Sequence, residues 1–228
     1  MKRSFLPLVL ICGSVLSTLL LLEIAVRLLF SQQIVLFPRN IVAKSYGEYR
    51  IRSNMASITY MHTSIDGRWK FTINSKGFRN YNEFSYDKGK KLRVLCLGDS
   101  HTLGYEVDQD QTYAAVIEKF LKQRGYEIEV INAGVSGFSN GEELIFLEHE
   151  GIRYQPDVVI LGFFANDFED NIRTRLFALD NNKNLVVVKK EYLPGAYFQQ
   201  TIYRYRLMRW LYEHSYLYAW VMNVAQEL

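Results

Sequence analysis

Short, mostly apolar runs recur along the middle of the chain, and small or amide residues close each of them. The runs occupy residues 94–97, 128–131 and 157–161. Runs of this length between turn residues are typical of strands that are buried on both faces of a parallel sheet. The pattern therefore predicts an α/β domain whose central strands are parallel.

Helical periodicity separates the predicted strands. Residues 112–124 place four apolar side chains on one face, and Gly125 follows as a helix terminator. Ser139 and Glu142 have the spacing of a capping box, which opens a second helix. Strands that alternate with helices in this way predict a sheet covered by helices on both faces.

The N-terminal segment has a different pattern. Residues 5–22 form an uncharged, mostly apolar stretch that is long enough to span a membrane. A cleaved signal peptide is the alternative, but no small-x-small site closes the stretch. Lys2 and Arg3 precede it, and the positive-inside rule then places the rest of the chain outside the cytoplasm. Glu23 and Arg27 have the spacing of a helical surface pair.

The segments between the anchor and the α/β pattern are less regular. Residues 31–55 are weakly patterned and predict a stalk with little structure of its own. Two short strands are expected at residues 58–62 and 69–73, with His62 at the surface. A polar link over residues 80–91 then leads to the first strand of the predicted sheet.

The C-terminal part combines a hairpin with an aromatic helix. Residues 175–180 and 185–190 flank a polar turn and predict an inserted β-hairpin, either a lip over the site or a plain surface insertion. Residues 198–224 are helical in pattern and rich in Tyr, Trp and Arg. This segment is either a core helix with snorkelling arginines or a helix that rests on the membrane surface.

Composition and charge exclude few functions. The net charge of +3 is too small to indicate a nucleic-acid partner, and 49% hydrophobic with 22% charged residues is ordinary for a folded protein. No HExxH or CxxC spacing occurs, so no metal site is predicted. Cys12 lies in the apolar stretch and Cys96 in a predicted strand, so no disulfide is expected.

The candidate chemistry lies at the ends of the predicted strands. Ser100 follows the first strand through Gly98 and Asp99, Gly134 follows the second, and Asn166 follows the third. The carboxyl ends of parallel strands share one edge of the sheet, which is where α/β proteins bind ligands. A serine hydroxyl beside backbone and amide N–H donors suits nucleophilic attack on a carbonyl and stabilisation of the oxyanion.

These three segments resemble the blocks of the SGNH (GDSL-type) hydrolase superfamily. Residues 98–100 resemble its Gly-Asp-Ser block, with Ser100 as the nucleophile. Gly134 and Asn166 resemble the glycine and asparagine that donate to the oxyanion. The family's Asp-x-x-His block, which supplies the base, is missing. His214 is the only late histidine, and Leu211 stands where the aspartate would be. His101 is a weaker candidate for the base.

The resemblance implies a doubly wound, flavodoxin-like three-layer sandwich with a mostly parallel sheet, preceded by one transmembrane helix. We expect an anchor with its flank over residues 1–30, the stalk and short strands over 31–91, and a hydrolase-like domain over 92–228. The missing block predicts that this domain is incomplete at its C-terminus.

The resemblance also implies an extracytoplasmic serine esterase that acts on a small acyl ester or an acylated glycan, without cofactor, nucleotide or metal. An O-acyltransferase on a glycan and a non-catalytic binding module remain as alternatives. The acyl group, the acceptor and the oligomeric state cannot be predicted from the sequence.

Overall fold

A parallel three-stranded sheet lies at the centre of the computed structural model, which describes residues 5–36 and 40–227. Its strand order is β6-β5-β7, and the strands are β5 (Leu92–Gly98), β6 (Ile128–Asn132) and β7 (Val158–Gly162). Cys96 pairs with Asn132 on one side and with Ile160 on the other. The three strands predicted from the apolar runs are therefore confirmed, and so is their parallel pairing.

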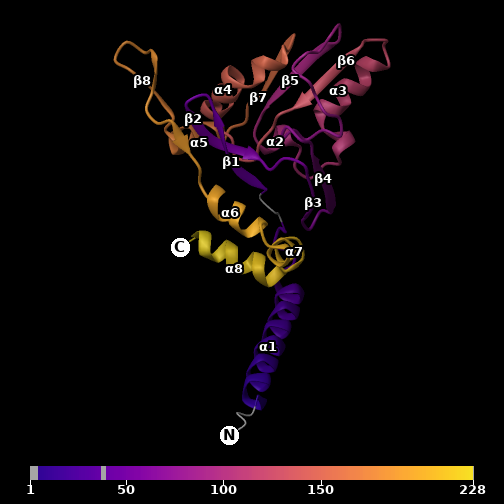
Figure 1. The fold of residues 1–228 in the computed structure, drawn as a ribbon, viewed down its shortest axis with the longest axis vertical. Helices are drawn as coiled ribbons and strands as arrows, with labels where there is room; N and C mark the ends of the chain where they lie inside the picture. Colours follow the sequence, from indigo (N-terminus) through magenta and orange to yellow (C-terminus); the bar gives the residue numbers. More distant parts are fainter. Residues whose placement is uncertain (1–4, 37–39, 228) are drawn as a thin grey trace.

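Helices cover both faces of the sheet, as Figure 1 shows. Leu95 and Leu97 of β5 point into an apolar cluster with α4 (Asn140–His149), whereas Val94 and Cys96 pack with α3 (Tyr113–Lys122). Ser139 and Glu142 form the predicted capping box at the start of α4. The alternation of buried side chains along β5 is thus what joins the layers, and the α/β class is confirmed.

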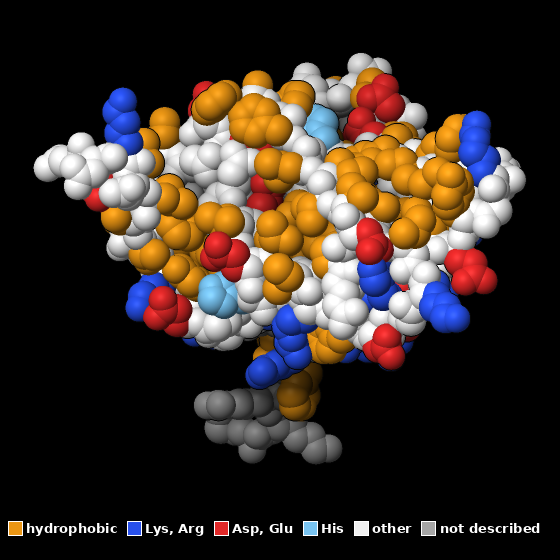
Figure 2. Space-filling model, turned by 90° about the horizontal axis from the view of Figure 1, so that it is seen from above, with side chains coloured by type: hydrophobic (Ala, Val, Ile, Leu, Met, Phe, Trp, Pro, Cys, Tyr) orange, Lys and Arg blue, Asp and Glu red, His pale blue; other side chains and the backbone are white. Residues whose placement is uncertain are grey.

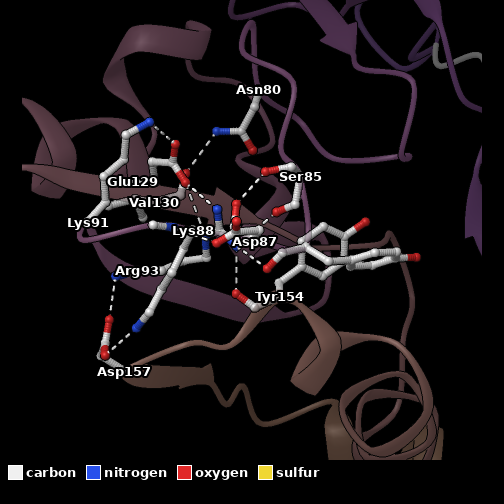
Figure 3. A network of polar contacts seen from close by, with 12 residues as sticks. Asn80, Ser85, Asp87, Lys88, Lys91, Arg93, Glu129, Val130, Tyr154 and Asp157 are labelled. Carbon is white, nitrogen blue, oxygen red and sulfur yellow. Dashed lines mark hydrogen bonds and ion pairs between the residues drawn. The ribbon is translucent and has the colours of Figure 1, made fainter.

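The amino edge of the sheet is held by a network of paired charges (Figure 3). Arg93 is 1% exposed, and its guanidinium bonds to the Glu129 carboxylate at 3.0 Å and to the Tyr154 carbonyl at 2.6 Å. The Arg93 backbone N–H donates to Asp157 at 2.7 Å, and Lys91 pairs with Glu129 at 2.6 Å. Each buried charge here has a partner of opposite sign or a carbonyl, which removes most of the cost of its burial.

The segment expected to be a bare stalk is instead part of the folded core. It forms β1 (Ile41–Tyr46) and β2 (Tyr49–Asn54), which pair with each other, and β2 also pairs with β10 (Glu191–Tyr192). Ile51 is fully buried. Arg52 makes a bidentate ion pair with Glu142 of α4, at 2.9 and 2.5 Å. The prediction was wrong because two of the partners that order this segment, Glu142 of α4 and the strand β10, lie ninety residues or more away, beyond the reach of local pattern.

The predicted strand pair is confirmed as an antiparallel hairpin of β3 (Ile58–Thr63) and β4 (Arg68–Ile73). His62 was expected at the surface, and that expectation was wrong. Its side chain is fully buried, with the Trp69 ring at 5.6 Å and the Tyr105 ring at 4.8 Å between centroids. Burial lowers the pKa of His62, although Glu106 opposes this effect.

The C-terminal part contains the predicted hairpin, but the predicted long helix is divided. The hairpin consists of β8 (Phe177–Leu179) and β9 (Leu185–Val187) and follows α5 (Asp167–Thr174). Three helices follow: α6 (Ala196–Tyr203), α7 (Arg206–His214) and α8 (Tyr216–Glu227). The backbone is extended at Tyr205 and Ser215, and the Ser215 hydroxyl accepts the Tyr218 N–H at 3.1 Å. A serine that caps a new helix explains the second break.

One helix of the described residues, α1 (Leu6–Phe30), is long and apolar enough to cross a membrane. A signal sequence passes the same test, so the helix is consistent with either. Lys2 and Arg3, which carry the orientation prediction, lie outside the described residues. In Figure 1, α1 points away from the α/β layers, and α7 and α8 lie at its C-terminal end. Figure 2 looks down from the opposite side, where charged side chains of both signs stand among apolar patches.

Candidate active site

Ser100 begins a single helical turn, α2 (Ser100–Leu103), directly after β5. The carboxylate of Asp99 caps this turn by accepting the His101 N–H at 2.8 Å. Gly98 leaves room for the turn, because a Cβ there would lie 2.0 Å from the hydroxyl oxygen of Thr102. The sequence Gly-Asp-Ser thus places the Ser100 side chain, which is partly exposed, at the carboxyl edge of the central strand.

Gly134 lies against the backbone of α2. A Cβ at this position would stand 2.2 Å from the Leu103 nitrogen, so no other residue fits without moving α2. The Gly134 N–H donates to the Asn132 side-chain oxygen at 3.1 Å. The Asn132 amide in turn donates to the Thr102 carbonyl at 2.8 Å. The end of β6 is therefore fastened directly to the turn that carries Ser100.

Asn166 lies between β7 and α5, and its side chain extends to Asp99, the residue before Ser100. Its side-chain amide donates to Asp99 at 3.3 Å and to Asp170 at 3.0 Å. Asp99 is fully buried and directly precedes Ser100. The structure therefore brings Ser100, Gly134 and Asn166 together around α2. The N–H groups of Gly134 and Asn166 are bonded within the protein, so an oxyanion would have to compete with these acceptors.

Three buried carboxylates lie near this site, and within the described residues no Lys or Arg is bonded to any of them, although the His101 ring contacts one. They are Asp99, Glu143 and Asp167, each no more than 2% exposed. Asn140 links two of them, since its amide donates to Glu143 at 2.9 Å and to Asp167 at 3.2 Å. Burial, together with the charges of Asp167 and Asp99, raises the pKa of Glu143 to about 7.

Asp167 orders the loop that carries Asn166. One of its carboxylate oxygens accepts the Phe164 N–H at 3.0 Å, and the other is buried without a hydrogen-bond partner in the described part of the chain. Asp167 directly follows the predicted donor Asn166 in the sequence, but Asn140 and Glu143 belong to no sequence motif. Only the capping box beside them marked the start of α4.

Arg79 braces the other end of α2 and was also missed. It is 1% exposed, and its guanidinium donates to the carbonyls of Leu103 at 2.9 Å and Val107 at 2.8 Å, and to that of Gly104. Its charge lies over the Phe71 ring, 3.7 Å from the centroid. Burial lowers the pKa of Arg79 to about 10, so it stays charged at neutral pH.

No histidine takes the place expected of the base within the described residues. His214 lies in α7, where its ring stacks on Trp210 and its Nδ1 donates to the Trp210 carbonyl, 2.9 Å away. The His101 ring contacts Asp99 at 3.2 Å and stacks against Phe164 at 3.9 Å between centroids. The His101 ring thus faces the Asp99 carboxylate. No cluster of metal-ligating residues occurs in the described ranges.

Comparisons with known proteins show the family to which the chain belongs. Residues 96–223, more than half of the chain, match the model of the GDSL-like lipase/acylhydrolase family, and the chain belongs to that family. An arylesterase of Vibrio mimicus is 26% identical over 97 residues, which are 42% of this chain and 48% of that protein. The esterase TesA of Pseudomonas aeruginosa is 30% identical over 74 residues, 32% of this chain and 37% of that protein. The chain thus spans less than half the length of these curated relatives.

Solved structures give a partial likeness. The SGNH-hydrolase family esterase AlinE4 is 32% identical, with a TM-score of 0.27, over 33% of this chain and 43% of that one. A likeness at this score carries no argument about the fold. The parallel sheet and its two helical layers are established by the strands of this chain itself.

Proposed function

We propose that this chain is the SGNH-type part of a serine esterase, with Ser100 as nucleophile and the N–H groups of Ser100, Gly134 and Asn166 as oxyanion donors. The observation that carries the proposal is the contact of the Asn166 amide with Asp99, which joins the third family block to the first. Membership of the acylhydrolase family supports the ester chemistry.

The reaction has two steps. The Ser100 oxygen forms a bond to the acyl carbon and loses its proton to an acceptor, and the alcohol leaves with a proton as the carbon–oxygen ester bond breaks. Water then attacks the acyl-serine, releases the acid and restores the hydroxyl. The donors stabilise the oxyanion formed in both steps, and loss of one such donor typically lowers the rate ~100- to 1000-fold.

Among the described residues, neither His214 nor His101 takes the place of the family's base, so we expect a low esterase rate. A serine hydroxyl is a weak nucleophile without an adjacent base. Serine hydrolases that lose a triad member still accelerate the reaction ~1000- to 10,000-fold over water. We therefore expect slow hydrolysis of activated esters, which need little proton transfer to the leaving group.

An ester assay tests the proposal. The full chain in detergent should release nitrophenol slowly from p-nitrophenyl acetate. Ser100→Ala should reduce that rate to the buffer level, and Asn166→Ala should lower it strongly. His214→Ala should change it little, because His214 packs in α7. Ser64→Ala, in the turn between β3 and β4, is the matched serine control and should leave the rate unchanged.

Two results would contradict the esterase proposal. Ser100→Ala with the wild-type rate would show that another group attacks the ester. Fast turnover that disappears in His214→Ala would show that α7 supplies the base. Transfer of acetate from the same ester to an added sugar, in place of water, would redirect the assignment to an O-acyltransferase.

We further propose that α1 is an uncleaved anchor and that the domain lies outside the cytoplasm. The length of α1 and the exposure of its apolar side chains support this. A C-terminal fusion to a reporter active only outside the cytoplasm should give signal, and a fusion to a cytoplasmic reporter should not. The reverse pattern, or recovery of a chain lacking residues 1–30, would contradict the anchor.

A further inference from the structure

The end of α1 is bonded to the turn between α7 and α8. One Glu23 carboxylate oxygen accepts the Ser215 hydroxyl at 2.7 Å and the Leu217 N–H at 3.0 Å, and the other accepts the Tyr216 N–H at 3.1 Å. These N–H groups are the unpaired donors of the first turn of α8. A residue of α1 thus caps a helix nearly two hundred residues away, and the pair Glu23–Arg27 is more than a surface ion pair.

Arg27 and apolar contacts complete this junction. The Arg27 guanidinium donates to the His214 carbonyl at 2.5 Å and lies 4.9 Å from the centroid of the Tyr216 ring. Val26 is buried in a cluster with residues of the chain just beyond α1 and of α8. The α7–α8 pair is therefore fixed to the last turns of α1 by charge, by helix capping and by packing.

The length of α1 sets the depth of this junction. A membrane core of ~30 Å is spanned by about 20 residues of helix. Counted from Leu6, that length ends close to Glu23 and Arg27, which then stand at the level of the lipid headgroups. The α7–α8 pair is bonded to these residues, so it must lie at the same level. Figure 1 shows both helices crossing the end of α1 rather than extending from it.

The exposed side chains of the two helices suit that level. On α7, Arg206, Arg209 and Glu213 line a groove against β3, on the side of the folded domain. Leu207, which lies between them in sequence on another face of the helix, is 64% exposed. On α8, three large apolar side chains are each about 40–50% exposed, and they are Trp220, Val221 and Val224. Apolar side chains with Trp and Arg beside them are typical of helices that lie in a membrane interface.

We propose that α7 and α8 form an interfacial platform that lies in the headgroup region of the membrane crossed by α1, with Leu207 and Val221 among the lipids. The proposal rests on the proposed anchoring role of α1. Arg204, just before α7, is exposed at the edge of the platform, and a basic residue near an anionic membrane surface favours binding to it. The platform would hold the esterase domain at a fixed height and orientation above the bilayer.

Site-specific fluorescent labels in lipid nanodiscs test the platform. Cysteine is introduced at Leu207, at Val221 or, as a control, at exposed Leu179 in the β8–β9 hairpin. Native Cys12 is replaced by serine in these variants. Cys96 can stay, because it is fully buried and burial raises the pKa of its thiol to about 12, which prevents labelling. A fourth sample carries the label on native Cys12, which is exposed on α1.

The readout is quenching by lipids brominated near the headgroup or along the chain. We expect headgroup-level bromine to quench the labels at Leu207 and Val221 by at least half as much as chain bromine quenches the label at Cys12, and the label at Leu179 to be unaffected. A quenched Cys12 with unquenched labels at Leu207 and Val221 would overturn the platform and leave the anchor intact. An unquenched Cys12 would instead overturn the anchor. Esterase assays are independent of both results.

Discussion

The two edges of the central sheet bury charge in opposite ways. At the amino edge, Arg93 is buried beside Glu129 and three backbone carbonyls, and its charge is compensated. At the carboxyl edge, Asp99, Glu143 and Asp167 are buried with no Lys or Arg bonded to them among the described residues, and only Asp99 contacts a histidine ring, that of His101. The same three strands thus end in a neutralised network on one side and in an accumulation of negative charge on the other.

The difference separates a structural network from a candidate site. Paired buried charges specify geometry and lose stability when one partner is removed. Buried carboxylates without cations raise one another's pKa and destabilise the fold at high pH, a cost that is common where a fold holds reactive groups in place. In this protein, the destabilising buried carboxylates lie at the carboxyl edge, together with Ser100 and Asn166.

The largest expected change comes from breaking the amino-edge network. Arg93→Met leaves the Glu129 carboxylate and several carbonyls without their donor, which should lower the free energy of unfolding by about 3–5 kcal/mol. Denaturant unfolding of the chain in detergent measures this value. Lys91→Met removes the exposed partner of the same Glu129 and should cost less than about 1 kcal/mol. Equal effects of the two substitutions would show that the buried pairing has no special weight.

At the carboxyl edge, removing a charge should raise the free energy of unfolding instead of lowering it. The pKa of Glu143 is raised to about 7 in the folded protein, so the folded state binds the proton more tightly than the unfolded chain does. Stability is therefore fully present below the ordinary pKa of Glu and is lost as the pH rises to about 7. Glu143→Gln removes the charge and should be more stable than the wild type at pH 8 by roughly 3 kcal/mol, and nearly equal to it at pH 5.

Melting temperatures at these two pH values test the sign. Glu118→Gln, an acidic residue on α3 outside the carboxyl-edge group, is the control and should show no such difference between pH 8 and pH 5. If Glu143→Gln were destabilising at both pH values, Glu143 would be acting as a needed hydrogen-bond acceptor rather than as a buried charge.

The smallest expected effect concerns Ser139, which lies at the start of α4 and contacts α5. Ser139 caps α4 through the Glu142 N–H, and its hydroxyl also contacts Thr174 of α5 at 3.3 Å. Ser139→Ala should therefore cost about 1 kcal/mol, while Ser139→Asp, which keeps a capping oxygen, should restore part of the loss if the added charge is tolerated beside Glu142. Thermal unfolding measures both. An unchanged Ser139→Ala would assign the stability of α4 to packing alone.

The sequence predicted the central layers because their pattern is local. Three apolar runs, the helix that ends before Gly125 and the capping box at Ser139 each appear within a short window, and each was found in the structure. The order of β1 and β2 could not be predicted in this way, because it depends on contacts such as Arg52 with Glu142. At the break before α8, Ser215 is a local cap through the Tyr218 N–H, whereas the further capping by Glu23 comes from a distant part of the chain.

The candidate site shows the same division. Ser100, Gly134 and Asn166 were identified from strand ends and from family resemblance, and the structure places them around one turn. Their roles remain predictions. Arg79, Asn140 and Glu143 were invisible to sequence pattern, because each acts on a group distant along the chain. Arg79, for example, holds the carbonyl of Leu103.

Covalent labelling of Ser100 tests the nucleophile most directly. Trypsin cleavage releases residues 94–119, a peptide in which Ser100 is the only serine. A fluorophosphonate reagent, added to the full chain, should leave one phosphonyl adduct on this peptide, formed slowly because no base is assigned. The adduct should be absent in Ser100→Ala and after unfolding in denaturant. An adduct on another peptide, or the same labelling of the unfolded chain, would contradict the proposal that the folded structure makes Ser100 the nucleophile.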